Sequence, residues 1–447
     1  MSTSLRDFIH GLDSRDVPAQ VLEQARRCLL DLVGVAAAGS TTRMSQIMRT
    51  YATANHGGQS GTARLLFDGR RVHPAGAALA NAATIDAMDG HDGHRLTRGH
   101  AGVAVLPAAL SVLDDAEASM RDLLTAMVVG YEVANRAGMA LHATAGDYHS
   151  SGAWNALGAA AVAARILCLD DDTTGHALGI AEYHAPRAPM MRCIDHPTMV
   201  KDSSAWGAHA GVSAALLAAA GFTGAPAALS SDSSDGVGLW DDLGERWTLL
   251  EQYFKPYPVC RWAHPAVHAT IGLVDEHDVA PEAIDHIQVT SFAAAVRLAI
   301  RLPANTEQAQ YSLCFPVAAA AVYRRLDPRA VADPTHVSEQ VRRLASTMQL
   351  RESPDMSAAF PRARTAEVSL VLTDSSRLSS GSTTAPGDPE ERLSNDTLED
   401  KFLDAVTDSV GRARADRLLD LMIRADNPLV RDLVTETCPP SRPGTTA

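Results

Sequence analysis

The chain has 447 residues, of which 46% are hydrophobic, 21% charged and 5% aromatic. This is the composition of a globular protein with a sizeable core, and the length predicts two or three domains, or one domain with an insertion. The formal net charge of −14 argues against a nucleic-acid-binding protein, because nucleic acid is bound by a basic face.

The six cysteines are scattered along the chain without a Cys-x-x-Cys pair. This spacing argues against a zinc knuckle or a redox dithiol and suggests a reducing compartment. The opening MSTSLRDFIHGLDSRD lacks the apolar core of a signal peptide. Apolar runs such as residues 156–169 stop short of the roughly 20 residues that a membrane helix needs. We therefore expect a cytoplasmic protein with no membrane partner and no nucleic-acid partner.

Residues 17–38 carry apolar side chains at helical spacing, among them Val21, Ala25, Cys28 and Leu32. This pattern predicts an amphipathic helix. Further helices are predicted over residues 75–86, 106–114, 120–141, 152–167 and 205–220. Several of these segments are rich in alanine and glycine, whose small side chains let helices approach closely, so the first part of the chain is expected to be a tightly packed helical domain.

The sequence pattern changes after about residue 250. Residues 283–292 and 366–374 show β-type patterns. Helices are predicted over 309–325 and 336–350, a Ser/Gly/Pro-rich linker over 375–392, and a closing helical stretch over 398–422. We therefore predict a mostly α, α+β protein: a large all-helical domain built from both chain ends (1–250 and 388–447), with an inserted α+β domain over 251–387.

Residues 86–102, DAMDGHDGHRLTRGHAG, gather three aspartates and three histidines among four glycines. A metal site, an acid/base site and a solvated surface loop are the alternatives. The metal alternative would use His91 and His94, but there is no His-Glu-x-x-His motif, and no glutamate at the twelfth position that an EF-hand requires. We therefore expect no metal.

Three other polar clusters precede predicted helices. His149 lies in GDYHSSGAW, Lys201 in HPTMVKDSSAWGAHAG, and Lys255, Cys260 and Arg261 lie in YFKPYPVCRWAH. Each residue taken singly also fits a structural or solvated role. Loops before helices offer free backbone N–H groups, which favour bound carboxylates.

Together these stretches resemble the MmgE/PrpD family. The resemblance runs over nearly the whole chain and includes VLEQARRCLLDLVGVAAAG, DAMDGHDGHRLTRGHAGVAVLPAAL, GYEVANRAG, YHSSGAWNALGAAAVAARIL, AQYSLCFPVA and LEDKFLDAV. It implies the fold predicted above, with an active site between the two domains. It also implies a homodimer that acts on di- or polycarboxylates without a metal or an organic cofactor.

Carried over residue by residue, the resemblance implies Asp89, His100, His149, Lys201 and Lys255 as site residues, and the segment YFKPYPVCRWAH adds Cys260 and Arg261 to the expected site. The catalytic residues are Asp89, His100, His149 and Lys201; the substrate-binding residues are Lys255, Cys260 and Arg261. Asp89 is expected to orient a neighbouring cation, and Lys255 and Cys260 are expected to close the site from the inserted domain.

Three positions depart from the family pattern. Cys260 stands where the family's decarboxylase has histidine, Phe315 stands where tyrosine is common, and Gly93 replaces a threonine. These changes remove possible proton donors, so the sequence favours an epimerase, which needs no leaving group. The expected substrate is an iminodisuccinate-like amino-polycarboxylate. The alternatives are a dehydratase of the 2-methylcitrate type and a decarboxylase of the cis-aconitate type.

Overall fold

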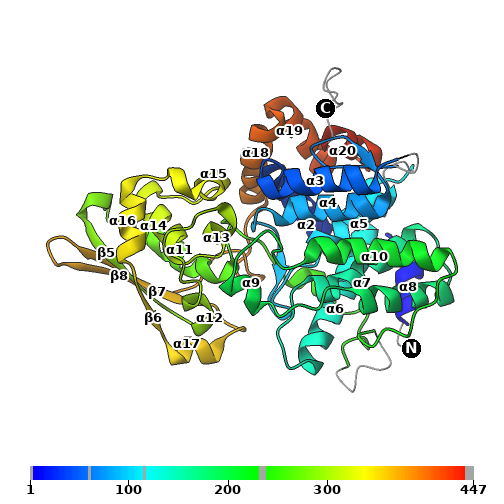
Figure 1. Ribbon diagram of the computed structural model, residues 1–447, viewed down its shortest axis with the longest axis horizontal. Helices are drawn as coiled ribbons and strands as arrows, with labels where there is room; N and C mark the ends of the chain where they lie inside the picture. Colours follow the sequence, from blue (N-terminus) through cyan, green and yellow to red (C-terminus); the bar gives the residue numbers. More distant parts are fainter. Residues whose placement is uncertain (1–3, 59–61, 114–116, 231–237, 438–447) are drawn as a thin grey trace.

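The structure, a computed structural model, describes residues 4–58, 62–113, 117–230 and 238–437. Two lobes are visible in Figure 1. The first and last parts of the chain form a helical lobe, and the part between them forms a lobe that contains a sheet. No helix in the described part of the chain is long and apolar enough to cross a membrane.

The first part of the helical lobe contains ten helices among the described residues. They are α1 (Leu5–Gly11), α2 (Ala19–Gly39), α3 (Arg43–His56), α4 (Pro74–Asp86), α5 (Gly102–Leu113), α6 (Met120–Thr144), α7 (Gly152–Ile166), α8 (Asp171–His184), α9 (Met191–Asp195) and α10 (Ser204–Ala219). Short strands β1 (Ala63–Arg64) and β2 (Arg71–Val72) pair antiparallel. The predicted helices correspond to α2, α4, α5, α6, α7 and α10.

Small residues let α6 and α10 pack closely on α7. A Cβ atom on Gly158 of α7 would lie 2.5 Å from the Gly130 carbonyl oxygen of α6, and one on Gly211 of α10 would lie 2.5 Å from the Ala156 carbonyl oxygen of α7. Neither position has room for a larger side chain. The close packing expected from the alanine- and glycine-rich segments is therefore present.

The end of the chain returns to the helical lobe. Its helices are α18 (Asn395–Val410), α19 (Arg412–Leu419), a π-helical turn (Asp420–Arg424) and α20 (Val430–Thr437). α18 packs on α2 and places Phe402 against Gly34. The predicted helix over 398–422 is interrupted at Gly411, whose φ of 83° does not fit a right-handed helix.

The other lobe contains a four-stranded sheet of order β6-β5-β7-β8: β5 (Ile284–Ser291), β6 (Gln349–Glu352), β7 (Ala366–Leu372) and β8 (Arg377–Thr383). β5 is parallel to β6 and antiparallel to β7, and β7 is antiparallel to β8. Its helices are α11 (His264–Glu276), α12 (Ala293–Val296), α13 (Thr306–Gln310), α14 (Cys314–Tyr323), α15 (Pro328–Ala332), α16 (Glu339–Thr347) and α17 (Pro354–Ala359). Helices α11 and α16 pack on the sheet, and α14 contacts both. The predicted fold class is confirmed.

Three local predictions were wrong. The expected linker over 375–392 contains β8, an edge strand whose side chains are mostly exposed, so it lacks the apolar alternation that identifies a strand. The expected helix over 309–325 is split into α13 and α14, and the one over 336–350 ends early and continues into β6. The exact domain boundaries stay a prediction.

Candidate active site

The segment 86–102 joins α4 to α5; its residues 86–94 lie in the interior of the protein, whereas Leu96 is 41% exposed. The most buried titratable side chains of the segment, 3% exposed or less, are those of Asp86, Asp89, His91, Asp92 and His94. Within it, β3 (Gly93–His94) pairs with β4 (Gln252–Tyr253), which directly precedes Lys255. The surface-loop alternative is therefore wrong, because these charges have been taken out of water.

A buried ion pair joins Asp89 to Lys255. Lys255 Nζ lies 2.5 Å from Asp89 Oδ1, and both side chains are at most 4% exposed. Burial alone would raise the pKa of Asp89, but the charges of Lys255 and Lys201 hold it well below its ordinary value. Burial likewise acts to lower the pKa of Lys255, and Asp89 reverses this so that the pKa is raised. The expected role of Asp89, to orient a cation, fits this geometry.

Lys201 also points inward, toward a residue that the sequence reasoning did not select. Its side chain is 1% exposed, and Nζ donates a hydrogen bond of 2.6 Å to Gln310 Oε1. The same oxygen accepts a hydrogen bond of 2.8 Å from the Asp89 backbone N–H. Gln310, from α13, thus ties the helical lobe to the sheet-containing lobe. Its only signal in the sequence was its place in the motif AQYSLCFPVA.

The backbone before α10 is what brings Lys201 inward. Lys201 and Ser203 both have positive φ, 49° and 66°, which is unfavourable for residues with a Cβ. Such backbone strain tends to be kept where the side chain is needed at a site. The lysine is therefore not the solvated side chain that its neighbours in the sequence also allowed.

His100 and His91 share one backbone carbonyl. His100 Nδ1 lies 2.7 Å from the Asp92 carbonyl oxygen and His91 Nδ1 lies 3.3 Å from it. Because a carbonyl only accepts, His100 Nδ1 carries the proton and Nε2 keeps its lone pair. Burial, followed by the charge of Lys255, lowers the pKa of His100 to about 4, so the free imidazole is neutral at pH 7. The two rings meet edge to face with centroids 4.4 Å apart.

Two further carboxyl groups complete the cluster, and sequence reasoning gave them no role. Burial, and then the neighbouring Asp202, raise the pKa of Asp86 well above its usual value, which favours the protonated form of this carboxyl group. Among the described residues, Asp86 Oδ2, Asp202 Oδ2 and His91 Nε2 are buried without a hydrogen-bond partner. Such atoms are the ones that a polar ligand would satisfy.

Asp92 is a further buried carboxyl group of the 86–102 segment, next to Tyr131. Its Oδ2 atom accepts a hydrogen bond of 3.0 Å from Tyr131. Burial, and then the charge of Asp31, raise the pKa of Asp92 to about 8. Asp31 in turn lies 2.6 Å from Lys401 Nζ of α18, which also donates to the Gly90 carbonyl. Helix α18, near the end of the chain, therefore contacts the 86–102 segment through Lys401.

We expect Asp92→Asn to gain stability relative to wild type as pH rises. The pKa of Asp92 is higher in the folded than in the unfolded chain, so its contribution is fully present below about pH 4 and is lost as pH rises toward 8. The difference in free energy of unfolding should grow by up to about 1.4 kcal/mol per pH unit between these limits. Urea denaturation from pH 5 to 8 measures it, with exposed Asp355→Asn as the control. A constant difference would contradict the assignment.

The other predicted residues differ in their placement. The Cys260 backbone N–H donates to the Gln310 carbonyl at 2.8 Å, and burial raises the pKa of its thiol to about 12. Arg261 donates to two backbone carbonyls and lies 3.2 Å from Asp388. His149 is half-buried, with Nδ1 2.8 Å from the Asp147 carbonyl oxygen, and no hydrogen bond or ion pair among the described residues joins it to the cluster. Its catalytic role stays a prediction.

The departures at Gly93 and Phe315 also have structural explanations. A Cβ atom on Gly93 would lie 2.5 Å from Tyr253 Oη and 2.8 Å from His100 Nδ1, so the tyrosine hydroxyl occupies the place that a residue-93 side chain would need. Phe315 is 1% exposed in the core. The loss of a hydroxyl at position 93 is thus accompanied by a hydroxyl from Tyr253 at the same point.

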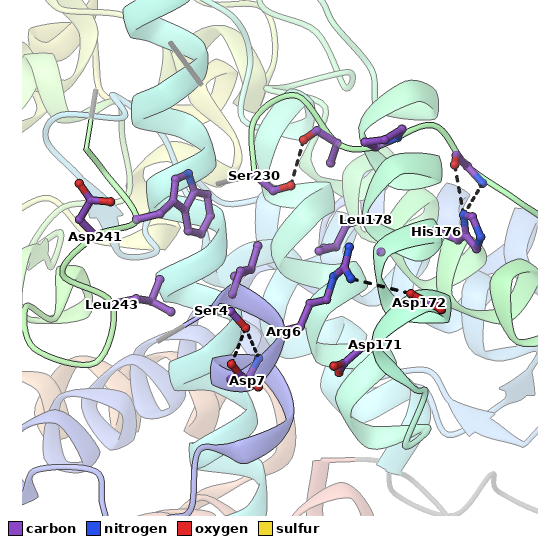
Figure 2. Close-up of a pocket in the computed structure, with 16 residues that line it drawn as sticks. Ser4, Arg6, Asp7, Asp171, Asp172, His176, Leu178, Ser230, Asp241 and Leu243 are labelled. Atoms are coloured by element: carbon purple, nitrogen blue, oxygen red, sulfur yellow. Dashed lines mark hydrogen bonds and ion pairs between the residues drawn. The ribbon is translucent and has the colours of Figure 1, made fainter. Parts of the chain in front are cut away.

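A cavity of about 270 Å³ lies beside the cluster, between the two lobes. It is lined by the neighbours of Asp89 and Lys255, namely Gly90 and Pro256, and by Lys401 and Arg325. A more open cavity of about 810 Å³ lies near the N-terminus (Figure 2). Neither described lining includes a residue of the cluster itself, but the open cavity also lacks the residues next to Asp89 and Lys255 that line the smaller one. Its charges interact locally, as in the 3.9 Å contact of Arg6 with Asp172. We therefore place the candidate active site at the junction of the lobes.

The described residues contain no group of three or more histidine, cysteine, aspartate or glutamate side chains arranged to hold a metal ion. The charges in the cluster are instead provided by Lys201 and Lys255, opposite Asp89. Such a site can bind carboxylates and stabilise negative charge that develops next to them.

The fold and this cluster define an enzyme family. The MmgE/PrpD N-terminal domain matches residues 3–240 and the MmgE/PrpD C-terminal domain matches residues 257–425. The chain belongs to the MmgE/PrpD family, which is a family of enzymes.

Its relatives include decarboxylases. Human cis-aconitate decarboxylase is 28% identical over 440 residues, which cover 90% of this chain and 87% of the human protein. The mouse cis-aconitate decarboxylase is 28% identical over 445 residues, covering 90% and 86% of the two chains. A cis-aconitate decarboxylase of Aspergillus terreus is 25% identical over 299 residues, covering 61% and 60%. These relatives favour the decarboxylase alternative over the epimerase that the three departures suggested.

Proposed function

We propose that this protein is a decarboxylase of a small unsaturated polycarboxylate of the cis-aconitate type. The observation that carries the proposal is the buried cluster of Lys201, Lys255, Asp89 and His100 at the junction of the lobes. The similarity to cis-aconitate decarboxylases over about nine-tenths of the chain supports the choice of reaction.

The reaction needs charge stabilisation and one proton. Loss of CO₂ from a carbon next to a C=C bond leaves an electron pair that spreads through the double bond toward a remaining carboxylate. Lysine side chains near that carboxylate stabilise the charge, and an acid then protonates carbon. The balance is one substrate and one proton in, and one CO₂ and one unsaturated dicarboxylate out.

We propose that His100 is the acid that donates this proton to carbon. A bound polyanion favours the charged form of the imidazole, so its pKa rises from the low value of the free site, and Nε2 becomes an acid aimed at substrate. Nδ1 stays bonded to the Asp92 carbonyl throughout, which fixes the ring. Lys201 and Lys255 bind substrate carboxylates, and Gln310 and Asp89 hold these ammonium groups in place.

The test is decarboxylation of cis-aconitate by the purified protein in D₂O. We expect release of CO₂ and one deuterium on carbon in the product, both unchanged after exhaustive EDTA treatment. No CO₂ from cis-aconitate or other unsaturated tricarboxylates would overturn the proposal. Activity lost with EDTA and restored by one divalent ion would revive the metal alternative at His91 and His94.

Epimerisation of an iminodisuccinate-like substrate is the second candidate, and the thiol at Cys260 is the observation that favours it. This thiol remains protonated in its buried setting, and could serve as a second acid opposite a base. The same assay separates the candidates: an epimerase exchanges the α-hydrogen of iminodisuccinate with solvent and scrambles its configuration without releasing CO₂. A dehydratase would instead convert 2-methylcitrate into a conjugated alkene, seen by its absorbance.

We also propose a homodimer. The helical lobe exposes large apolar side chains on α3 and α10, with Ile47, Tyr51, Trp206 and Leu217 each at least 40% exposed. Light scattering at micromolar concentration should give about twice the monomer mass of 47.3 kDa. Trp206→Asp should shift the mass toward the monomer, whereas Leu302→Asp, on the other lobe, should not. A monomeric wild type would contradict the proposal.

A further inference from the structure

Arg364, directly before β7, is a buried guanidinium with unfilled hydrogen-bonding capacity. Its side chain is 3% exposed. Among the described residues, its Nε and Nη1 atoms have no hydrogen-bond partner, and neither has Asp388 Oδ1, which lies 3.8 Å from Nη1. An arginine always carries its charge, and a buried charge is costly unless it is paired and hydrogen-bonded. The described residues therefore leave two hydrogen-bond donors of this buried guanidinium without an acceptor.

Arg261 provides an internal comparison. The two guanidinium groups lie against the same Tyr253 ring, at 5.3 Å from the centroid for Arg261 and 5.0 Å for Arg364. Arg261 donates to the Ala385 carbonyl at 2.9 Å and the Pro386 carbonyl at 3.0 Å, and lies closer to Asp388, at 3.2 Å. The Arg261 guanidinium is thus hydrogen-bonded within the protein, whereas the Nε and Nη1 donors of Arg364 are available to a ligand.

The Tyr253 ring connects Arg364 to the candidate active site. Tyr253 Oη and His100 Nδ1 flank the point where a Cβ atom of Gly93 would lie. The charge of Arg364 also acts on its surroundings, because it opposes the effect of burial on the pKa values of Tyr253 and Cys260. Tyr253 thus contacts the Arg364 guanidinium through its ring and approaches the His100 side of the site through its hydroxyl.

We propose that Arg364 binds one carboxylate of the substrate, on the Tyr253 side of the site, and so selects tricarboxylates over dicarboxylates. This inference rests on the proposed function. Lys201 and Lys255 provide cations for two carboxylates, and Arg364 provides the third, with a planar donor group that matches a carboxylate. Of the two arginines at Tyr253, only Arg364 is assigned this role; Arg261, which the sequence placed among the substrate-binding residues, is instead given a structural role by its bonds to two backbone carbonyls.

The experiment measures binding by calorimetry on the full chain, with two unreactive probes: tricarballylate, a saturated tricarboxylate, and succinate, a dicarboxylate. Arg364→Met should weaken tricarballylate binding about 10- to 100-fold, the range for a hydrogen bond to a charged group, and succinate binding less than about 3-fold. Arg49→Met is the matched control. Arg49 is also buried, but donates to the carbonyls of Ser40 and Phe67 in the helical lobe, so its loss should leave the ratio of the two affinities unchanged.

Equal effects of Arg364→Met on both probes, or no effect, would overturn the inference, as would a wild type that does not prefer tricarballylate. If Arg364→Met does not fold, Arg364→Lys decides by the same comparison, because it keeps the charge and loses the planar donors; an unchanged ratio in that variant also overturns the inference. Failure of the proposed function is distinguishable, since it appears as a wild type that binds tricarballylate but releases no CO₂ from any unsaturated tricarboxylate.

Discussion

Replacing His100 by glutamine is expected to lower kcat about 10²- to 10⁴-fold, the range for loss of a positioned acid or base. Glutamine is a neutral side chain of similar length that keeps an N–H donor, and the backbone N–H of residue 100 still donates to Ser151, so the loop should keep its shape. What the variant lacks is a group that takes up a proton when a polyanion binds. The measurement is single-turnover decarboxylation, with circular dichroism to confirm folding.

Lys201→Ala should have an effect of the same size, with a rise in KM as well, because it removes a cation that binds substrate and one of the two hydrogen bonds to Gln310 Oε1. His94→Ala is the control for both. His94 is more buried than His100, at 1% exposed, but its Nε2 atom faces Glu251 at 3.3 Å, away from the cluster. Its loss should lower stability and leave the kcat of the folded protein within a few-fold of wild type. An inactive His94 variant beside normal His100 and Lys201 variants would refute this assignment of the loop.

The sequence predicted what depends on local pattern and on the family resemblance. The helical periodicity of residues 17–38 corresponds to α2, and the polar loops around residues 89, 201 and 255 do converge. It did not predict β8, because an exposed edge strand rich in serine lacks apolar alternation. An isolated strand of this kind is recognised only from its partner, here β7.

The site residues that the sequence did not predict are those brought together by tertiary contacts. Asp86 is one of three aspartates in the 86–102 segment with nothing in the sequence to set it apart, and Arg364 has ordinary neighbours in the chain. Their importance comes from contacts over long sequence separations: with Asp202 for Asp86, and with Tyr253 for Arg364. Gln310 reaches Asp89 across 221 positions. A single sequence cannot place such residues together, since neither spacing nor periodicity carries that information.

Breaking the Asp89–Lys255 pair is expected to cause the largest loss of stability. Lys255→Met leaves the Asp89 carboxylate buried without its main partner, and removal of one member of a buried pair typically costs about 3–5 kcal/mol. The pKa of Asp89 should rise in that variant, because Lys255 is the cation that most opposes the effect of burial. Urea denaturation at pH 7 measures the change in the free energy of unfolding.

The double variant Asp89→Asn/Lys255→Met separates this effect from lost packing. This variant removes both charges of the buried pair, so that no unpaired Asp89 carboxylate remains. It should therefore be more stable than Lys255→Met, although it carries one more substitution. It should nevertheless remain inactive, because the site has lost a carboxylate-binding cation. Asp408→Asn, which breaks the exposed pair with Arg329, should change stability little. A double variant less stable than Lys255→Met would show that the Asp89 carboxylate is stabilised by other cations, such as Lys201, and that the ion pair with Lys255 does not account for its charge.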